Sequence, residues 1–541
     1  MTEELNIRQG VLKDIPELVR LYEETVEHLE SHVNYPGWKK GVYPGEAAAE
    51  EGVKTGTLYV AEAGGRIIGS IILNEKQEAA YSEASWSVDA APGEVMVIHT
   101  FLVHPDFRRS GAGKLLMDFA EVQALKEGKK TIRLDVYEKN EPAVRLYERQ
   151  GYHYTATVDL GLGSRGLPWF KLYEKTAGEC LYGLLSRISP LSSEAMELAA
   201  LTWSHVAKPL FSLGILEEDV IKIAGISSSP SVDIGKRALI IMCGDNGIVE
   251  EGVTQTGQEV TAVVTENMTD GNSSVCLMAE RAGVDVFPVD IGVCRELRSG
   301  TRNPLIRKKL AYGTKNFRKE PAMSRETAVS AIAAGLCMAG ELKEKGYRLI
   351  ATGEMGIGNT TTSSAVAAML LGRDPAEMTG RGAGLSDEGL RKKVSVIREA
   401  VKRYEAQCRD AIDVIACVGG LDLAGLTGVF LGGAVYRIPV LIDGFISGTA
   451  ALAAAKLAPP ARDYMLATHV SAEPAGRLLL DELGLKPFVA AGMCLGEGTG
   501  AVASIPLLDM ALEVYTKMST FQDIQIEEYK PLAPQTNSGA H

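Results

Sequence analysis

Two glutamates in the second half of the chain stand in glycine-rich loops, where they could accept a proton. Glu354 opens the segment EMGIGNTT, and Glu497 lies within LGEGTGA. Glycines and hydroxyl groups at the start of a helix favour phosphate binding, and a carboxylate in apolar surroundings can have a raised pKa. From these residues alone, a second interpretation has equal weight: each glutamate only caps backbone N–H groups.

A loop in the first part of the chain has the composition of a pyrophosphate site. The segment RRSGAGK, Arg108 to Lys114, follows an apolar run that ends at Val103. Glycines at a turn from strand to helix let backbone N–H groups approach an anion, and the helix N-terminus favours negative charge. The segment by itself is equally compatible with an ordinary glycine turn.

The composition of the chain argues against several classes of function. The chain has 541 residues and a net charge of −13, which argues against non-specific binding of nucleic acid. The eight cysteines form no C-x-x-C pair and the eight histidines show no metal-ligand spacing, so we expect buried free thiols and no metal. No run is apolar enough to span a membrane, and the start MTEE is acidic, unlike a signal peptide. We therefore expect a cytoplasmic protein without a membrane partner.

Alternating strand and helix patterns must position the first loop. Gly64 and Gly65 between two apolar runs indicate a hairpin, and Asn140 is placed to cap a helix. We expect strands at 5–8, 58–62, 67–73, 95–103, 132–136 and 170–173, and helices after Asp14, around 115–122 and after Asn140. The first part is therefore predicted to be a mixed sheet with helices.

In the second part, apolar runs at 239–242, 348–351 and 439–442 alternate with helical patterns. Runs of this kind favour parallel strands that are covered on both faces. The fold class is therefore α/β, with a doubly wound, mostly parallel sheet after a helical N-terminal segment. The predicted division is a first domain at 1–175, a linker at 176–186, a second domain at 187–529 and a tail at 530–541.

The first domain resembles the GNAT family of acyl-CoA N-acyltransferases. The resemblance rests on His104-Pro105 before the RRSGAGK loop and on the pattern N-x-x-A-x-x-L-Y-x-x-x-G-Y that starts at Asn140. It implies acetyl-CoA as co-substrate and Tyr147 as the acid that protonates the departing thiolate. The residues expected to bind acetyl-CoA are Val103, Arg108, Arg109, Gly111, Gly113 and Asn140. The attacking amine must lose a proton, and Glu94 and His99 are the candidate bases; the amine itself is not identified.

The second domain resembles the nicotinate-nucleotide:dimethylbenzimidazole phosphoribosyltransferase family. The matching segments, in chain order, are KPLFSLG (208–214), GDNG (244–247), QEVT (258–261), GTKN (313–316), EMGIGNTT (354–361), VGGLD (418–422), DGF (443–445), SAE (471–473) and LGEGTGA (495–501). The resemblance implies transfer of a phosphoribosyl group from nicotinate mononucleotide to a benzimidazole nitrogen, which gives an α-ribotide and nicotinate. It implies no metal.

The same resemblance assigns roles by position. Glu497 matches the family's catalytic base. Glu354 and Gly356 match positions that contact the nucleotide, and the helix starts near Asn359, Thr360 and Gly498 are expected to hold its phosphate. Lys393 matches a lysine near the substrates, although a solvated helix lysine is an alternative. Thr256 and Val264 match the pocket of the base.

The sequence departs from the family at two positions and leaves the base open. Phe211 stands where many relatives have glycine, and Asn246 where many have histidine. A base pocket with few hydrogen-bonding groups discriminates poorly, so the base could be dimethylbenzimidazole, another benzimidazole, adenine or a phenol.

We interpret the chain as a bifunctional fusion of the two enzymes. In an alternative interpretation, the first domain binds acyl-CoA and regulates the second domain without turnover. A catalytically silent second domain is a further alternative, against which the presence of both Glu354 and Glu497 argues. The second resemblance also implies a homodimer.

Overall fold

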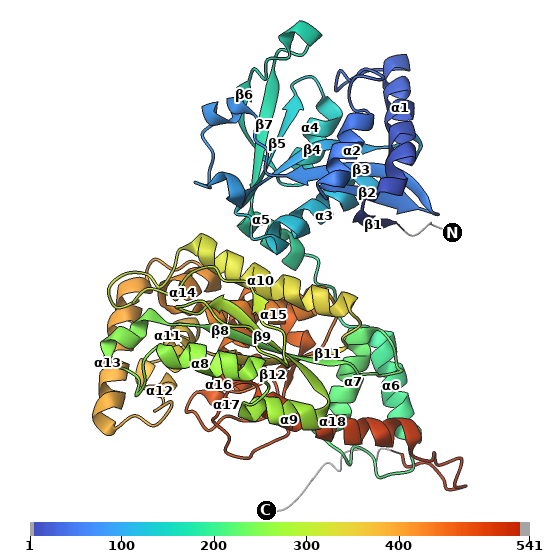
Figure 1. The fold of residues 1–541 in the computed structure, drawn as a ribbon. Coiled ribbons are helices and arrows are strands. Elements are labelled where there is room, and N and C mark those ends of the chain that lie inside the picture. Colours follow the sequence, from blue (N-terminus) through green and yellow to red (C-terminus); the bar gives the residue numbers. More distant parts are fainter. Residues whose placement is uncertain (1–4, 531–541) are drawn as a thin grey trace, which may run out of the picture. The chain divides into compact units, whose positions relative to one another are not determined.

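The computed structural model describes residues 5–530, and the chain divides into two compact units, Met1–Gly183 and Leu184–His541 (Figure 1). The acidic start at 1–4 and residues 531–541 of the expected tail lie outside the described residues. Residues 177–185 of the expected linker form helix α5 (Ala177–Leu185), and the division falls inside this helix.

The first unit is built on a seven-stranded mixed sheet with the order β1-β2-β3-β4-β5-β7-β6, as the α/β prediction requires. Its strands are β1 (Asn6–Gln9), β2 (Leu58–Ala63), β3 (Arg66–Asn74), β4 (Val95–Val103), β5 (Thr131–Tyr137), β6 (His153–Val158) and β7 (Phe170–Thr176). The hairpin at Gly64-Gly65 is present, because Ala63 pairs with Arg66. β6 was not predicted, although Tyr154, Ala156 and Val158 alternate with polar residues; it is a short edge strand of which only Val158 is buried.

Only β4 and β5 run parallel in this sheet, and they pair over part of their length. The pairing begins at Val95 opposite Thr131 and ends at Ile98 opposite Leu134. Helices α1 (Ile15–Ser31) and α2 (Glu46–Lys54) share an apolar core with the sheet, whereas α3 (Ala112–Lys126) connects β4 to β5 and α4 (Glu141–Arg149) follows β5. The end of β4, and with it the RRSGAGK loop, therefore follows the stretch in which β4 pairs with β5.

The second unit contains a six-stranded, entirely parallel sheet with the order β10-β9-β8-β11-β12-β13. Its strands are β8 (Arg237–Gly244), β9 (Val284–Gly292), β10 (Ile306–Arg307), β11 (Leu349–Met355), β12 (Val440–Ile442) and β13 (Met465–Ala467). The chain runs outward from β8 in one direction and from β11 in the other. The doubly wound prediction is confirmed, and the strand order reverses between β8 and β11.

Helices cover both faces of this sheet (Figure 1). They are α6 (Ser193–His205), α7 (Ile215–Ser227), α8 (Glu259–Thr269), α9 (Ser274–Ala282), α10 (Arg325–Glu344), α11 (Asn359–Leu371), α12 (Pro375–Met378), α13 (Asp387–Tyr404), α14 (Ala411–Val418), α15 (Leu421–Val435), α16 (Phe445–Leu457), α17 (Gly476–Leu483) and α18 (Thr499–Lys517). The main core lies between β8, β11 and the helices α6 to α9 and α18. The expected helical N-terminal segment corresponds to α6 and α7.

Candidate functional site

A cavity of about 360 Å³ lies at the carboxyl ends of β11, β12 and β13, the edge at which a doubly wound sheet usually binds its ligands. It is lined by residues that follow β11, β12 and β13 and by the loop before α18. Five of the predicted site residues line it: Glu354, Gly356, Asn359, Thr360 and Glu497. The structure thus brings together segments that are far apart in the sequence.

Glu497 is held in the cavity wall by a strained turn. Its φ of 61° lies in the left-handed region, which costs a non-glycine residue roughly 1–3 kcal/mol. The turn packs directly on β11, since a Cβ added to Gly353 would lie 2.4 Å from the carbonyl oxygen of Glu497. Its Oε2 is buried and has no hydrogen-bond partner among the described residues. Burial, and then the charge of Asp443, raise the pKa of Glu497, as suits a proton acceptor.

The cap of α18 is Asp443, not Glu497. Its Oδ1 accepts hydrogen bonds from the N–H groups of Gly500 at 2.7 Å and Ala501 at 3.0 Å, and its Oδ2 from Gly498 at 3.2 Å. This corrects the expectation for Gly498: its N–H is already bound to a carboxylate, and a phosphate at this helix start would be repelled by Asp443. Glu497 is thereby left free of any capping role.

Glu354 and its neighbours give the cavity a dense group of carboxyls. Glu354, at the end of β11, accepts a hydrogen bond from the side-chain amide of Asn359. Burial raises the pKa of Glu354 well above its usual value, and the nearby Asp422 and Asp443 raise it further. Burial also raises the pKa of Asp422 to about 7. Such surroundings stabilise a positively charged ring or sugar.

Lys393 supplies a positive charge beside the cavity. It lies on α13 and is 1% exposed, which excludes the solvated alternative. Its Nζ donates to Thr360 Oγ1 at 2.8 Å and to the carbonyl oxygen of Gly380 at 3.3 Å. Burial lowers the pKa of Lys393 to about 8, so it remains largely protonated at neutral pH. An anion at the start of α11 would meet this charge and the hydroxyl group of Thr360.

Of the other predicted positions, Gly356 lines the cavity, whereas the two residues of the expected base pocket do not. Gly356 is enclosed, since an added Cβ would lie 2.3 Å from the carbonyl oxygen of Gly244. Thr256 is exposed before α8, and Val264 on α8 packs against the main core. Neither of the two lines the cavity, so the structure does not join them to Glu497.

His469 was missed as a site residue. It follows β13, is 4% exposed and lines the cavity, and its Nδ1 has no hydrogen-bond partner among the described residues. Burial lowers its pKa, opposed by the charge of Asp443. Asp443 and His469 each follow a short strand at the same edge of the sheet, and that position was the available sequence signal. The expectation of buried thiols fails at Cys494, which is exposed and lines the same cavity.

In the first unit, the RRSGAGK loop presents free donors. Arg108 and Arg109 are exposed, and Gly111 caps α3 with a φ of 94°. No hydrogen bond from the backbone N–H of Gly111, Gly113 or Lys114 occurs within residues 5–530. Two guanidinium groups and free N–H groups at a helix start fit a pyrophosphate.

Tyr147 lies on α4, close to the part of β4 that does not pair with β5. Its ring centroid is 6.4 Å from that of Phe101, and burial, followed by the charge of Asp135, raises its pKa. It is therefore protonated at neutral pH and can donate a proton. Asn140 caps α4 by accepting a hydrogen bond from Ala143 N–H at 3.4 Å, and Val103 ends β4 opposite Gly69.

The structure distinguishes the two candidate bases, Glu94 and His99. Glu94 pairs with Lys130 Nζ at 2.8 Å and accepts from Ala91 N–H, and these contacts lower its pKa. Glu94 directly precedes β4, at the opposite end of this strand from the RRSGAGK loop. The expectation that it is a base is therefore corrected: Glu94 forms a structural ion pair. His99 lies just beyond the last paired position; its Nε2 donates to the carbonyl oxygen of Lys76 at 3.0 Å, which leaves Nδ1 as an acceptor.

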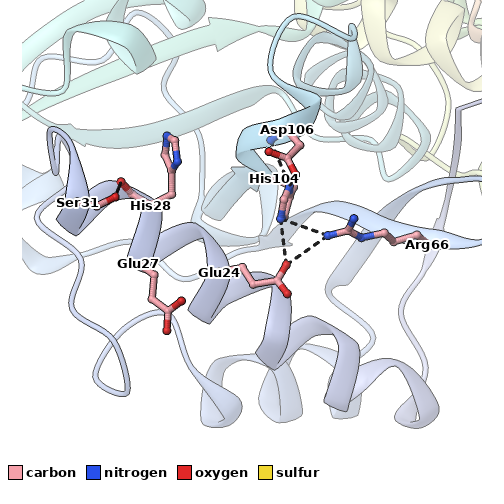
Figure 2. Close-up of a pocket in the computed structure, with 7 residues that line it drawn as sticks. All are labelled: Glu24, Glu27, His28, Ser31, Arg66, His104 and Asp106. Carbon is pink, nitrogen blue, oxygen red and sulfur yellow. Dashed lines mark hydrogen bonds and ion pairs between the residues drawn. The ribbon is translucent and has the colours of Figure 1, made fainter.

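A second, open hollow lies on the first unit and includes His104 and Asp106, which precede the RRSGAGK loop (Figure 2). Glu24 and Arg66 converge there on the ring of His104, whose Nε2 lies 3.0 Å from Glu24 Oε2. Asp106 N–H donates to the Nδ1 of the same ring. These groups satisfy one another, and none of the predicted site residues belongs to the hollow.

The described residues contain neither a metal cluster nor a membrane span. Within 5–530, no group of three or more His, Cys, Asp or Glu side chains could hold a metal ion. No helix there is both long and apolar enough to cross a membrane.

Comparisons with known proteins cover both units. Residues 188–526 match the model of a phosphoribosyltransferase family, and residues 18–152 match that of the acetyltransferase (GNAT) family. The nicotinate-nucleotide–dimethylbenzimidazole phosphoribosyltransferases of Ruminiclostridium cellulolyticum and Acetivibrio thermocellus are 45% and 43% identical to this chain, covering 64% and 65% of it and 98% and 99% of their own length. The crystal structure of CobT from Thermus thermophilus matches with 37% identity and a TM-score of 0.58, over 62% of this chain and 99% of that one. The chain therefore belongs to the nicotinate-nucleotide–dimethylbenzimidazole phosphoribosyltransferase family and carries a domain of the acetyltransferase (GNAT) family ahead of the phosphoribosyltransferase domain.

Proposed function

We propose that the second unit transfers the phosphoribosyl group of nicotinate mononucleotide to a benzimidazole-type base and releases nicotinate, in the assembly of the cobalamin nucleotide loop. Two similar proteins named for this reaction support the substrates. The observation that carries the mechanism is the unpartnered, buried Oε2 of Glu497 in the wall of the cavity.

The groups of the cavity match the charges of this reaction. The nicotinate ring is cationic in the nucleotide and leaves as a neutral pyridine, and the carboxyls of Glu354, Asp422 and Asp443 favour positive charge nearby. Lys393 and Thr360 hold the phosphate at the start of α11. Glu497 removes the proton of the incoming nitrogen as that nitrogen attacks the sugar carbon. Holding both rings in one cavity supplies proximity.

The test is incubation of the full chain with nicotinate mononucleotide and a set of bases, with products identified by mass. We expect an α-ribotide of a benzimidazole and an equal amount of nicotinate. Adenine and phenols are the alternative acceptors, and a ribotide formed only with one of them would revise the base. If no base in the set leads to the release of nicotinate, the proposal is contradicted.

We also propose that the first unit is an acetyl-CoA-dependent N-acetyltransferase. The free N–H groups of the RRSGAGK loop and the protonated Tyr147 near the end of β4 support it. The alternative is an acyl-CoA-binding regulatory module, which would bind acetyl-CoA without acetylating any amine. Mass analysis of amines incubated with acetyl-CoA and the full chain separates the two.

A further inference from the structure

The parallel pair β4 and β5 parts at one position and leaves two polar residues facing each other. The last paired positions are Ile98 and Leu134, so His99 and Asp135 are the next residues on their strands. Beyond them, β5 continues to pair with β7 but not with β4. No backbone hydrogen bonds therefore close the sheet between His99 and Asp135.

His99 and Asp135 project from the same face of the sheet. Val97 pairs with Arg133, and each strand alternates its faces, so the residues two positions on share that face. His99 also pairs with Ile72, which belongs to the core under α1 and α2. Tyr81, which packs against Val97 on this face, donates its hydroxyl hydrogen to Asp135 Oδ2 at 2.9 Å.

Tyr147 and the acetyl-CoA loop lie on the opposite face. The ring of Tyr147 is near Phe101, and a Cβ added to Gly113 would lie 3.6 Å from the same Phe101 ring. Burial, and then the charge of Asp135, raise the pKa of Tyr147, so the carboxylate acts on the tyrosine across the unclosed part of the sheet. An acid on one face and a carboxylate on the other thus flank the place where the strands part.

The surroundings of Asp135 are short of positive charge. Glu78 is a second carboxylate near it, and Tyr43, which is hydrogen-bonded to Thr100 at 2.6 Å, lies within reach of both charges. Arg133 is committed elsewhere, to Glu174, to Gln77 and to a backbone carbonyl. Burial raises the pKa of Asp135, against the effects of Tyr81 and His99. A bound cation would compensate these carboxylates.

We infer that Asp135 binds a protonated primary amine between His99 and Tyr81 and takes its proton, and that the acceptor is an amine without a carboxylate near its nitrogen. This inference deepens the proposed acetyltransferase function and rests on it. Asp135 would be a catalytic residue that the sequence analysis did not single out.

Protons and electrons balance in this transfer. The ammonium gives one proton to the Asp135 carboxylate, which later releases it to solvent. The lone pair of the free amine forms the C–N bond with the acetyl carbon, and the C–S bond breaks with its electrons on sulfur. Tyr147 protonates that thiolate, and the second proton of the amine restores the tyrosine through solvent. The products are an acetamide, CoA and one released proton.

The experiment uses the full chain, acetyl-CoA and matched pairs of amines, such as tyramine with tyrosine and phenethylamine with phenylalanine. We expect kcat/KM to be at least about tenfold higher for the member without the carboxylate, because that group would be repelled by Asp135 and Glu78. This readout needs no variant. Equal rates for both members would overturn the inference, whereas binding of acetyl-CoA without acetylation of any amine would contradict the proposed acetyltransferase on which it rests.

The Asp135→Asn variant tests the residue directly. We expect kcat/KM for the best amine to fall about 100-fold or more, with an unchanged dissociation constant for acetyl-CoA as proof of an intact fold. Asp89→Asn makes the same charge change at an exposed position of the segment that carries Tyr81, and should have no effect. Tyr81→Phe keeps the ring and should lower the rate several-fold. Near-normal turnover of Asp135→Asn contradicts the inference, whereas failure of the wild type to bind acetyl-CoA contradicts the proposed acetyltransferase itself.

Discussion

At the scale of single residues, the chemistry of the cavity depends on which carboxyl group caps a helix and which is free to accept a proton. The sequence offers Glu497 as either a base or a cap, and nothing in LGEGTGA separates the two roles. The structure separates them because Asp443, over 50 positions earlier in the chain, binds the N–H groups at the start of α18. The role of Glu497 thus depends on a residue far away in the chain. A single sequence does not show which distant carboxylate binds the N–H groups at a given helix start.

Lys393 gives a prediction for the dependence on pH. Burial lowers its pKa to about 8 from the usual 10.5, so the charged form, which binds phosphate, is lost above about pH 8. We expect kcat/KM for nicotinate mononucleotide to fall up to about tenfold per pH unit above this value, whereas an ordinary lysine would hold it to about pH 10. The measurement is a pH profile of kcat/KM.

The control for this profile is the neighbouring Lys392, which is exposed. Lys393→Met should weaken nucleotide binding and abolish the loss at alkaline pH, and Lys392→Met should leave the profile unchanged. If kcat/KM of Lys393→Met still falls at alkaline pH, the fall is caused by the titration of another group.

At the scale of elements, the site depends on close contact between β11 and the turn before α18. Gly353 allows this contact, because any side chain there would meet the backbone of Glu497 and Gly498. The sequence predicted β11 from its apolar run, but not that its glycine faces another backbone.

We predict that Gly353→Ala lowers kcat about 100-fold or more, since displacing the turn by about 1 Å misplaces the base. The dissociation constant of the nucleotide should change much less. Gly448→Ala on α16 is the matched control: an added Cβ there meets nothing closer than 3.5 Å, so it should keep full activity. Equal activity of the two variants would show that the contact does not position Glu497.

Other elements show what a single sequence reveals and what it hides. Strand β4 was predicted with its bounds, because Val95–Val103 is a mostly apolar run that only His99 and Thr100 interrupt. Helix α5 was missed, although Thr176 and Glu179 form a reciprocal cap at its start, the T-x-x-E pattern of a capping box. Asp135 was missed for a different reason: its role depends on where two strands cease to pair, and pairing is a tertiary property.

At the scale of the whole molecule, the chain consists of two units with separate cores. The core of the first unit contains Leu18 and Ile72, whereas that of the second contains Leu239 and Ile505. Each site is built from residues of its own unit. We therefore expect each ligand to stabilise one unit.

Calorimetry of the full chain tests this expectation. Acetyl-CoA at about 100 times its dissociation constant should add about 2.7 kcal/mol to one unfolding transition and leave the other in place. Nicotinate mononucleotide should shift only the second transition. A single transition that both ligands shift equally would show that the units unfold as one body.

The most direct test of the account is the turnover of Glu497→Gln with nicotinate mononucleotide and the benzimidazole that proves to be the best acceptor. Glutamine keeps the size of the side chain but has no carboxylate to accept the proton. We predict that nicotinate release falls about 10²- to 10⁴-fold, that nucleotide binding is retained, and that Glu513→Gln, an exposed change on α18, has no effect. Turnover of Glu497→Gln within a few-fold of the wild type would contradict the assignment of the base.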